Sequence, residues 1–223
     1  MKLLGEAVSR DKGFIEGLAM NRASKAAELM HLLPQLRDPQ SELLLLQSCM
    51  GIAKLFFSLR TCQPIHMEEA AMLFDKELRE AVEDIVIGGG PFFGDLQWRL
   101  ASLPIRFGGL GLYSTLEASS YAFLASRAQS WVLQDHILRD SGLCGMDLYF
   151  VNALDSLRGA ISDLDVSSFT SKDTVPPTTQ HILASALFSK CLGYGSKSAF
   201  FFLCLQPAHA QDFLLVIPIN GLG

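Results

Sequence analysis

Charged residues are scarce in this chain, and basic residues are in deficit. Only 18% of the 223 residues are charged, against about 25% in a typical soluble domain, and 18 Lys and Arg against 23 Asp and Glu leave a net charge of −5. A protein that binds nucleic acid on its own usually carries a basic excess, because it must neutralise phosphates. The chain as a whole lacks that excess. Its low charge indicates a surface that is covered by a partner or by more of its own chain.

Paired cysteines and long apolar runs are absent as well. The cysteines have none of the close spacings that structural zinc sites use: Cys49, Cys62, Cys144, Cys191 and Cys204. We interpret them as scattered reduced thiols of a reducing compartment. The N-terminal residues do not form a signal peptide, and no run approaches the about 20 apolar residues of a membrane span. These absences predict an intracellular protein, nuclear or cytoplasmic, that is not secreted and contacts no membrane.

Motifs of catalysis and phosphate binding are missing too. Gly193–Ser198 contains the residue types of a Walker A loop without their spacing, so we interpret residues 193–196 as a turn. The chain has no Gly-x-Ser-x-Gly elbow, no His-Glu-x-x-His frame and no Asp-Asp dipeptide. We therefore expect no catalytic residue, no bound metal and no cofactor. An independent hydrolase or transferase is the least favoured class.

What the chain does have is helical periodicity. Apolar residues recur at helical spacing, which predicts helices at about 14–36, 39–60, 66–87, 95–101, 115–140, 146–163, 178–190 and 198–205. Residues 212–218 are predicted to be a strand or an extended segment. We predict a mainly α fold, an irregular helical bundle followed by a smaller α-rich region, with little or no sheet. The expected division is 1–140 and 141–223, with a linker at about 164–177.

The stretch 66–87 has the clearest two-sided pattern. Its apolar stripe comprises Met67, Ala70, Ala71, Phe74, Leu78, Val82 and Ile85. Its predicted solvated face comprises Glu68, Glu69, Asp75, Lys76, Glu77, Arg79, Glu80, Glu83 and Asp84. In the preceding stretch, Asp38 is the expected N-cap, Pro39 the first helical residue and Gly51 the site of a kink or close helix crossing.

The segment that follows is predicted to be a short helix and a compact, glycine-rich loop at 103–112. Ser114 or Thr115 is then expected to cap the next helix, with Glu117 as a capping-box partner. We find no internal repeat and almost no alternating pattern in this succession of helices.

Three arginines are the residues with the best case for nucleic-acid binding. Arg60, Arg99 and Arg106 lie near helix ends or in loops, and Trp98 and Phe107 lie beside the last two. A guanidinium group can pair with a phosphate, and an aromatic ring can stack on a base. The other interpretation is that the two aromatic residues anchor the core and the arginines belong to an ordinary surface.

Three segments of the chain form an ordered set of motifs. They are 43–62, which begins LLLLQSCMGIAKL, then 74–79, FDKELR, and then 97–112, QWRLASLPIRFGGLGL, which AFLAS at 122–126 follows. The most specific element is Leu-Pro-x-x-x-Gly-Gly-Leu-Gly at 103–111. In this order they resemble the part of non-LTR (LINE-type) retroelement reverse transcriptases that follows the palm. Leu3–Gly5 and Ala208–Leu214 extend the resemblance toward both ends.

The resemblance implies a truncated reverse-transcriptase-like protein. Residues 1–140 would be a thumb-like helical region with a post-thumb loop, whose structural motif is Trp98, Pro104, Gly108, Gly109 and Gly111. In these RNA-directed DNA polymerases the thumb positions the primer–template, so an RNA/DNA primer–template would be a partner only within a full-length polymerase. The palm with its x-x-Asp-Asp motif and the endonuclease domain are absent, and the Cys/His motif would begin beyond Gly223. We therefore expect that this chain is not an enzyme by itself.

An alternative function comes from the apolar character of the chain. The low charge and the apolar stretch at 199–219 suit a helical protein–protein interaction module that binds a protein partner through an apolar surface. A non-functional retroelement relic is the other alternative.

Overall fold

Helices account for most of the chain that the structure describes. The computed structural model describes residues 2–3, 6–7, 9, 11–88, 90, 93–138, 148–161, 165, 167–169, 175–176 and 178–195. The helices are α1 (Lys12–Met30), α2 (Pro39–Leu45), α3 (Ala53–Thr61), α4 (Pro64–Ile87), α5 (Asp95–Ala101), α6 (Thr115–Leu138), α7 (Leu148–Ala160) and α8 (Thr179–Gly195). Two short antiparallel strands, β1 (Lys2–Leu3) and β2 (Glu6–Ala7), pair near the N-terminus. The predicted mainly α fold with little sheet is confirmed.

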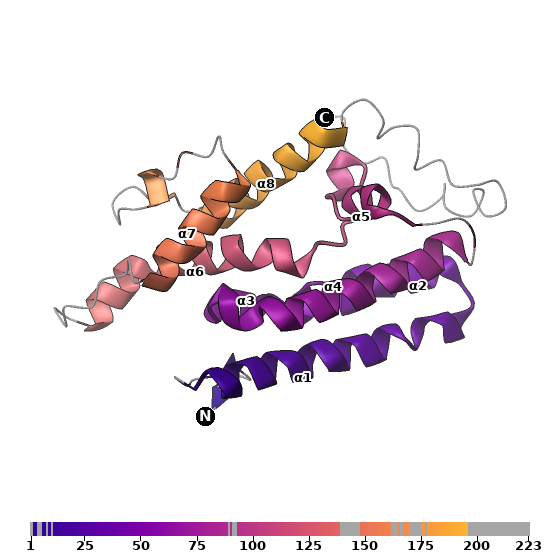
Figure 1. Ribbon diagram of the computed structural model, residues 1–223, viewed down its shortest axis with the longest axis horizontal. Helices are drawn as coiled ribbons and strands as arrows, with labels where there is room; N and C mark the ends of the chain where they lie inside the picture. The colour runs from indigo at the N-terminus through magenta and orange to yellow at the C-terminus, as the bar shows by residue number, and fades with distance from the viewer. Residues whose placement is uncertain are drawn as a thin grey trace.

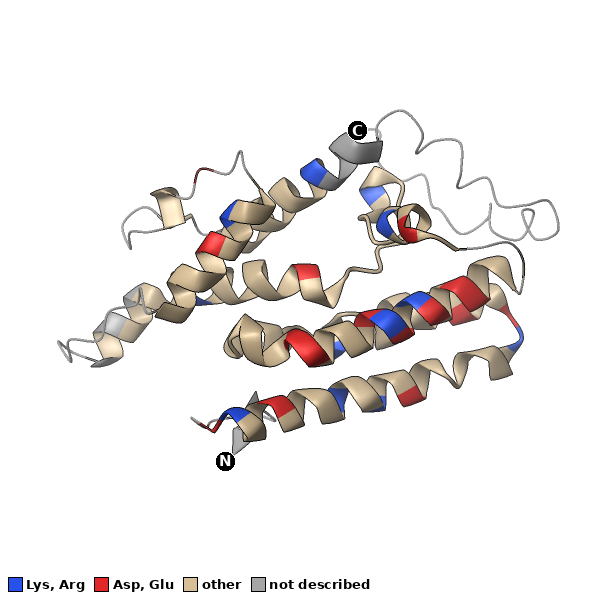
Figure 2. Cartoon of the chain, viewed as in Figure 1, with Lys and Arg blue, Asp and Glu red and all other residues tan. Residues whose placement is uncertain are grey.

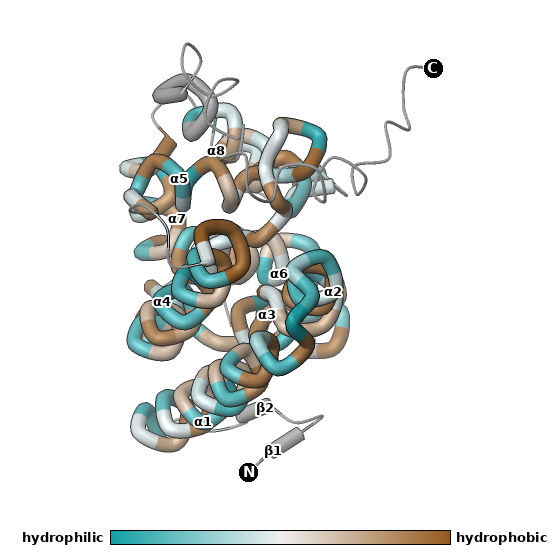
Figure 3. Tube along the Cα trace, turned by 90° about the vertical axis from the view of Figure 1, so that its right-hand side faces the viewer, coloured by the Kyte–Doolittle hydropathy of each residue, from teal (hydrophilic) through white to brown (hydrophobic). Residues whose placement is uncertain are grey.

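The helices form two layers, which Figure 1 shows one above the other. In the lower layer, α1 and α4 run in the same direction and α2 and α3 return between their ends. In the upper layer, α6 packs against α3 and α4 on one side and against α7 and α8 on the other. The end view in Figure 3 shows the same succession from α1 through α6 to α8. Helix α6 therefore joins the two layers.

The stripe predicted on α4 forms the centre of the lower layer. All of its seven members are buried, and Met67, Phe74 and Leu78 are 0% exposed. The face predicted to be solvated is wrong at Glu77, and Asp75, Arg79 and Glu83 are only half-exposed. Glu77 is buried, and His31 Nε2 lies 2.7 Å from its Oε2, whereas Asp75 is half-buried and caps another helix. Both acids are withdrawn from water because they have polar partners on neighbouring elements.

Helices α1 and α4 are joined by polar pairs at two levels. His66 Nδ1, in the first turn of α4, lies 3.4 Å from Glu16 Oε1 of α1. The other pair is the one between His31, just after α1, and Glu77. Since both pairs link positions that advance together along the two helices, they fit the common direction of α1 and α4 seen in Figure 1.

The first predicted helix, at 14–36, is too long. Helix α1 ends at Met30, and residues Leu33–Leu36 form a separate 3-10 turn. The reason is Pro34, which has no N–H to continue the helical ladder and whose ring clashes with the preceding turn. Its start is well defined, because the Asp11 side chain accepts a hydrogen bond from the Phe14 N–H at 3.4 Å.

The second predicted helix, at 39–60, is divided at Gly51. Asp38 caps α2 by accepting the Ser41 N–H at 3.2 Å, as expected. Residues Leu46–Met50 form a π-type turn, Gly51 is extended with ψ −163°, and α3 begins at Ala53. A Cβ on Gly51 would lie 3.3 Å from the Leu46 carbonyl oxygen, so the turn is closely packed here.

This divided stretch is also the one described segment that is apolar enough to cross a membrane. An 18-residue window within residues 39–61 has a mean hydropathy of 1.5, and core helices of soluble proteins pass the same test. The break at Gly51 interrupts the hydrogen-bond ladder that a lipid environment would require to be continuous. The side chains of Leu43, Leu46, Leu55 and Leu59 are buried in the core.

The later helices agree with prediction except at the end of α8. Helices α6 and α7 lie within the predicted ranges 115–140 and 146–163. Helix α8 continues to Gly195, so the turn predicted at 193–196 is wrong for its first three residues. A glycine costs a helix only about 1 kcal/mol relative to alanine, which a packed helix can tolerate. The helix predicted at 198–205 and the extended segment predicted at 212–218 lie outside the described residues.

The expected division into two regions stays a prediction. Buried residues on both sides of residue 141 belong to one apolar cluster, which extends from Ala19 of α1 to Leu187 of α8. Within the expected linker, Phe169 is 3% exposed and belongs to the same cluster.

Candidate functional site at the glycine turn

The most specific sequence motif folds into a tight turn, which we call the glycine turn (residues 102–112). It follows α5 directly, and a 3-10 turn at Ile105–Phe107 forms its middle. Its ends are joined by backbone hydrogen bonds, from the Leu110 N–H to the Ala101 carbonyl at 3.0 Å and from the Gly111 N–H to the Leu103 carbonyl at 2.9 Å. The predicted compact loop is thus a closed structure held by its own backbone.

Two glycines of this turn are needed for different physical reasons. Gly108 has a φ of 82°, a conformation that side-chain-bearing residues rarely adopt, although a Cβ there would meet open space. At Gly109 the limit is space, because a Cβ would lie 2.1 Å from the carbonyl oxygen of Leu103. Gly111 is a second position with positive φ, at 71°, and Pro104 is buried where the 3-10 turn begins.

The glycine turn is held between the two layers. From the lower layer, the Gln47 side-chain amide donates to the Leu110 carbonyl at 2.7 Å. Toward the upper layer, Leu100 and Leu103 form a small apolar cluster with Phe188 of α8. The rings of Tyr113 and Phe188 lie 5.5 Å apart, centroid to centroid. These contacts fix the position of the turn relative to the π-type turn at Leu46–Met50 and to α8.

A carboxylate from α4 caps the start of α6. Asp75 accepts hydrogen bonds from the Ser114 hydroxyl at 2.6 Å, the Thr115 N–H at 2.6 Å and the Leu116 N–H at 3.2 Å. Ser114 in turn accepts the Glu117 N–H at 3.2 Å. Of the two expected caps, Ser114 therefore has this role, whereas the Thr115 hydroxyl is buried with no hydrogen-bond partner among the described residues. Glu117 makes no capping-box contact there and lines a cavity instead.

Two of the three candidate arginines lie on consecutive elements that face α8. Arg99, in the last turn of α5, and Arg106, in the glycine turn, are both exposed on the side that faces α8. Arg106 donates to the Ser185 hydroxyl at 3.3 Å and lies 4.8 Å from the Phe107 ring centroid. Arg60 lies in the last turn of α3 in the lower layer, and no contact within the described chain joins it to the other two.

The two aromatic residues beside these arginines are partly buried. Trp98 packs against the main apolar cluster, and Phe107 packs against the small cluster of Leu100, Leu103 and Phe188. Of the two interpretations, core anchoring therefore describes the positions of both rings. Neither ring stands free on the surface as a stacking platform would.

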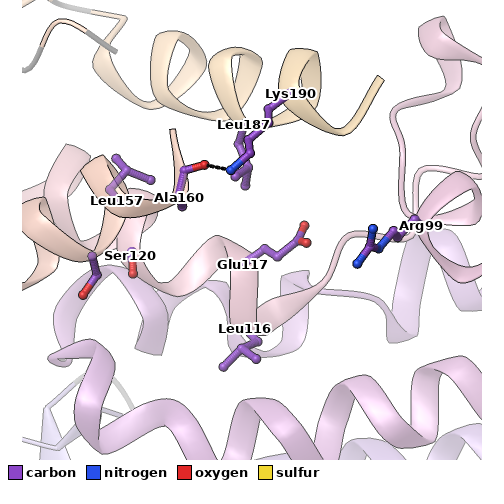
Figure 4. A pocket seen from close by; sticks show the side chains of 9 residues that line it. Arg99, Leu116, Glu117, Ser120, Leu157, Ala160, Leu187 and Lys190 are labelled. Atoms are coloured by element: carbon purple, nitrogen blue, oxygen red, sulfur yellow. Dashed lines mark hydrogen bonds between the residues drawn. The ribbon is translucent and has the colours of Figure 1, made fainter. Parts of the chain in front are cut away.

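A cavity of 570 Å³ opens beside Arg99, between α6, α7 and α8 (Figure 4). Its lining comprises Arg99, Leu116, Glu117, Ser120, Ser156, Leu157, Ala160, Leu187 and Lys190. Leu157 and Leu187 are buried and form its apolar wall. Lys190 donates a hydrogen bond to the Ala160 carbonyl, the last residue of α7, which is a favourable position for a cation at a helix C-terminus.

The carboxylate of Glu117 is the acidic group of this cavity. The surrounding chain partly desolvates this carboxylate and raises the pKa of Glu117, although the residue as a whole is exposed. The nearby carboxylate of Asp75 raises this pKa further, and the positive charge of Arg99 opposes both effects. The carboxyl group therefore takes up a proton more readily than an ordinary glutamate.

Most residues that line this cavity cannot be predicted from the sequence. Glu117 is recognisable only as a candidate cap, and Lys190, Ser120 and Ser156 carry no local signal, because the cavity forms where distant helices meet. Among the described residues, no group of three His, Cys, Asp or Glu side chains could hold a metal ion.

No protein-family model, curated protein or solved structure matches the chain.

Proposed function

We propose that the chain is the thumb and connection segment of a non-LTR retroelement reverse transcriptase, which helps to position the primer–template and does not catalyse polymerisation by itself. What supports the proposal is the ordered set of motifs at 43–62, 74–79 and 97–112. Its most specific member is the glycine turn, whose backbone geometry needs its glycines. A closed turn docked between two helical layers suits a part that must hold a long substrate in a constant place.

The glycine turn and α5 are the part of the surface best suited to a phosphate backbone. Arg99 and Arg106 lie there and are exposed, and a guanidinium group can form paired hydrogen bonds with a phosphate. The outer face of α4 suits this role poorly, because its acidic residues outnumber its basic ones (Figure 2). With a net charge of −5, the chain would depend on a polymerase core for most of its affinity.

Binding of a labelled RNA–DNA hybrid, followed by fluorescence anisotropy over a range of salt concentrations, tests the positioning role. We expect weak, salt-dependent binding. The double variant Arg99→Gln/Arg106→Gln should reduce the slope of log K against log salt by about 2 units, one for each phosphate contact. Lys25→Gln, which removes an exposed charge from α1, is the matched control. Equal losses in the variant and the control, or no binding at all, would overturn this role.

A primer-extension assay tests the non-catalytic half of the proposal. The purified chain, with a primer–template, Mg²⁺ and nucleotides, should extend no primer, because the sequence has no Asp-Asp pair to hold the metal ions of phosphoryl transfer. Templated incorporation above that of a heat-denatured control would show that the chain is itself a polymerase.

A protein-interaction module is the second candidate, and an exposed apolar end of the molecule favours it. Where α6 ends and α7 begins, Leu133, Ile137 and Leu148 are 59%, 66% and 69% exposed. Trp131 and Phe150 hold the two helices together beside them, with ring centroids 5.5 Å apart. Size-exclusion chromatography with light scattering tests this candidate. A stable monomer at high concentration would count against a large adhesive surface.

A further inference from the structure

The basic side chains that line the cavity beside Arg99 have hydrogen-bond donors without a partner in the described part of the chain. Arg99 forms no hydrogen bond and no ion pair within the described residues, although its guanidinium carries five N–H donors. Lys190 uses one donor on the Ala160 carbonyl, and an ammonium group has three. Glu117 is the acidic residue among the nine that line the cavity. Two cations against one carboxylate leave an excess of one positive charge.

Beside these charges the cavity has an apolar wall. Leu157 and Leu187 are 2% and 7% exposed and line it from α7 and α8. Figure 4 shows Glu117 between Arg99 on one side and Lys190 on the other, with these leucines on the α7 and α8 side. The Ser120 hydroxyl adds a further polar group from α6. Ligand sites typically combine an apolar lining with a few polar groups of this kind.

We propose that this cavity binds a small amphipathic monoanion, a carboxylate or phosphate ester with a short hydrocarbon chain. Its oxyanion would lie between the Arg99 guanidinium and the Lys190 ammonium, and its hydrocarbon chain would contact Leu157 and Leu187. A volume of 570 Å³ falls within the range of about 300–1,000 Å³ of small-molecule sites. One negative charge balances the excess that the lining residues leave.

Glu117 sets the selectivity of this site. Its carboxylate lies near Arg99 of α5 and Asp75 of α4, and it competes with a ligand anion for the Arg99 guanidinium. Removal of this competition should therefore strengthen the binding of an anion. A ligand with a cationic group would show the opposite dependence.

The experiment is isothermal titration of the full chain with hexanoate, with hexyl phosphate and with the uncharged hexan-1-ol. We expect hexanoate, hexyl phosphate or both to bind, and the tighter of the two identifies the preferred head group. Hexan-1-ol should bind about tenfold more weakly or not at all, since it offers no charge-assisted hydrogen bond. Equal binding of the alcohol and the anions, or no binding of either anion, overturns the proposal.

Variants then assign the binding to this cavity. Arg99→Gln should weaken anion binding about tenfold, whereas Arg106→Gln, the same change in the glycine turn outside the cavity, should leave it unchanged. Glu117→Gln should strengthen binding several-fold, and a gain cannot arise from misfolding. Weaker binding in Glu117→Gln, or equal losses in the two arginine variants, overturns the assignment.

This site does not depend on the proposed role in a polymerase, and the two proposals fail separately. Hybrid binding requires both Arg99 and Arg106, whereas the small anion requires Arg99 and is insensitive to Arg106. Loss of salt-dependent hybrid binding with retained hexanoate binding would refute the first proposal alone. The reverse pattern would refute the second alone.

Discussion

The two layers of the molecule are stabilised in different ways. The lower layer, α1 to α4, is joined by continuous apolar stripes, and Phe74, Leu55 and Leu59 at its centre are 0% exposed. The upper layer, α5 to α8, packs on the lower one mainly through α6, with the glycine turn and the Asp75 cap as further links, and it leaves a cavity with three charged residues in its lining. The lower layer thus has the features of a scaffold, and the cavity that we propose as a binding site lies in the upper layer.

The largest difference between the layers should appear when the same leucine is truncated in each. Leu78→Ala, at a site with no exposure on α4, should destabilise the chain by about 4 kcal/mol, whereas Leu187→Ala, on the wall of the cavity, should cost about 2 kcal/mol. The reason is that Leu78 has close neighbours on all sides and Leu187 already borders open space. Urea unfolding followed by circular dichroism measures both. Equal losses would mean that the cavity is packed as tightly as the core.

The glycine turn that joins the layers should be sensitive to a single methyl group. Gly109→Ala forces a carbon against the Leu103 carbonyl and should cost about 3 kcal/mol. Gly108→Ala is the matched control. A methyl group at Gly108 meets open space, so only the positive φ destabilises this variant, by about 1 kcal/mol. A Gly109 variant as stable as the Gly108 variant would contradict the packing described for this turn.

The cap that α4 supplies to α6 should have an intermediate effect. Asp75→Asn weakens hydrogen bonds from the Ser114 hydroxyl and two backbone N–H groups, and we expect a loss of about 2 kcal/mol. Asp84→Asn, on an exposed position of the same helix, should change stability by less than about 0.5 kcal/mol. The free energies of unfolding in urea test the pair. If both variants behaved alike, Asp75 would not be the link between the layers.

The smallest expected effect is the pH dependence at Glu117. The pKa of Glu117 is raised in the folded chain, so ionisation of this side chain opposes folding. The free energy of unfolding therefore falls as pH rises from the ordinary pKa of glutamate through the raised pKa of Glu117. Glu117→Gln removes this effect. The variant should melt above the parent chain at pH about 7, and the gap should close below a pH of about 4.3, the ordinary pKa of glutamate. If the melting temperature of the variant rose further above that of the parent as pH fell, attraction of the Glu117 carboxylate to Arg99 would outweigh its desolvation.

The layers also differ in how far their structure is predictable from sequence. The stripe of α4, the Asp38 cap and the bounds of α5 follow from local spacing and are confirmed. Pro34 and Gly51 interrupt two predicted helices because each alters the backbone conformation at a single position. The spacing of apolar residues gives no sign of such a local change. Glu77 and Asp75 depart from the predicted solvated face because their partners, His31 and Ser114, lie far away in the sequence.

For the candidate site, sequence reasoning reaches the glycine turn and its arginines but not the cavity. The turn is a local motif with recognisable glycines, so its compactness is predictable. The cavity requires α5, α6, α7 and α8 to meet, and its residues Arg99, Glu117 and Lys190 span 92 positions of the chain (190 − 99 + 1). Only the packing of these helices brings the charges together.

We propose that this chain works as one segment of a reverse transcriptase, and the size of the native product tests this proposal most directly. A denaturing immunoblot of the cells that express the gene, with an antibody against residues 66–87, measures that size. The account predicts a band well above the 24.4 kDa of this chain, because a thumb segment functions together with a palm. A single band at 24.4 kDa would contradict it.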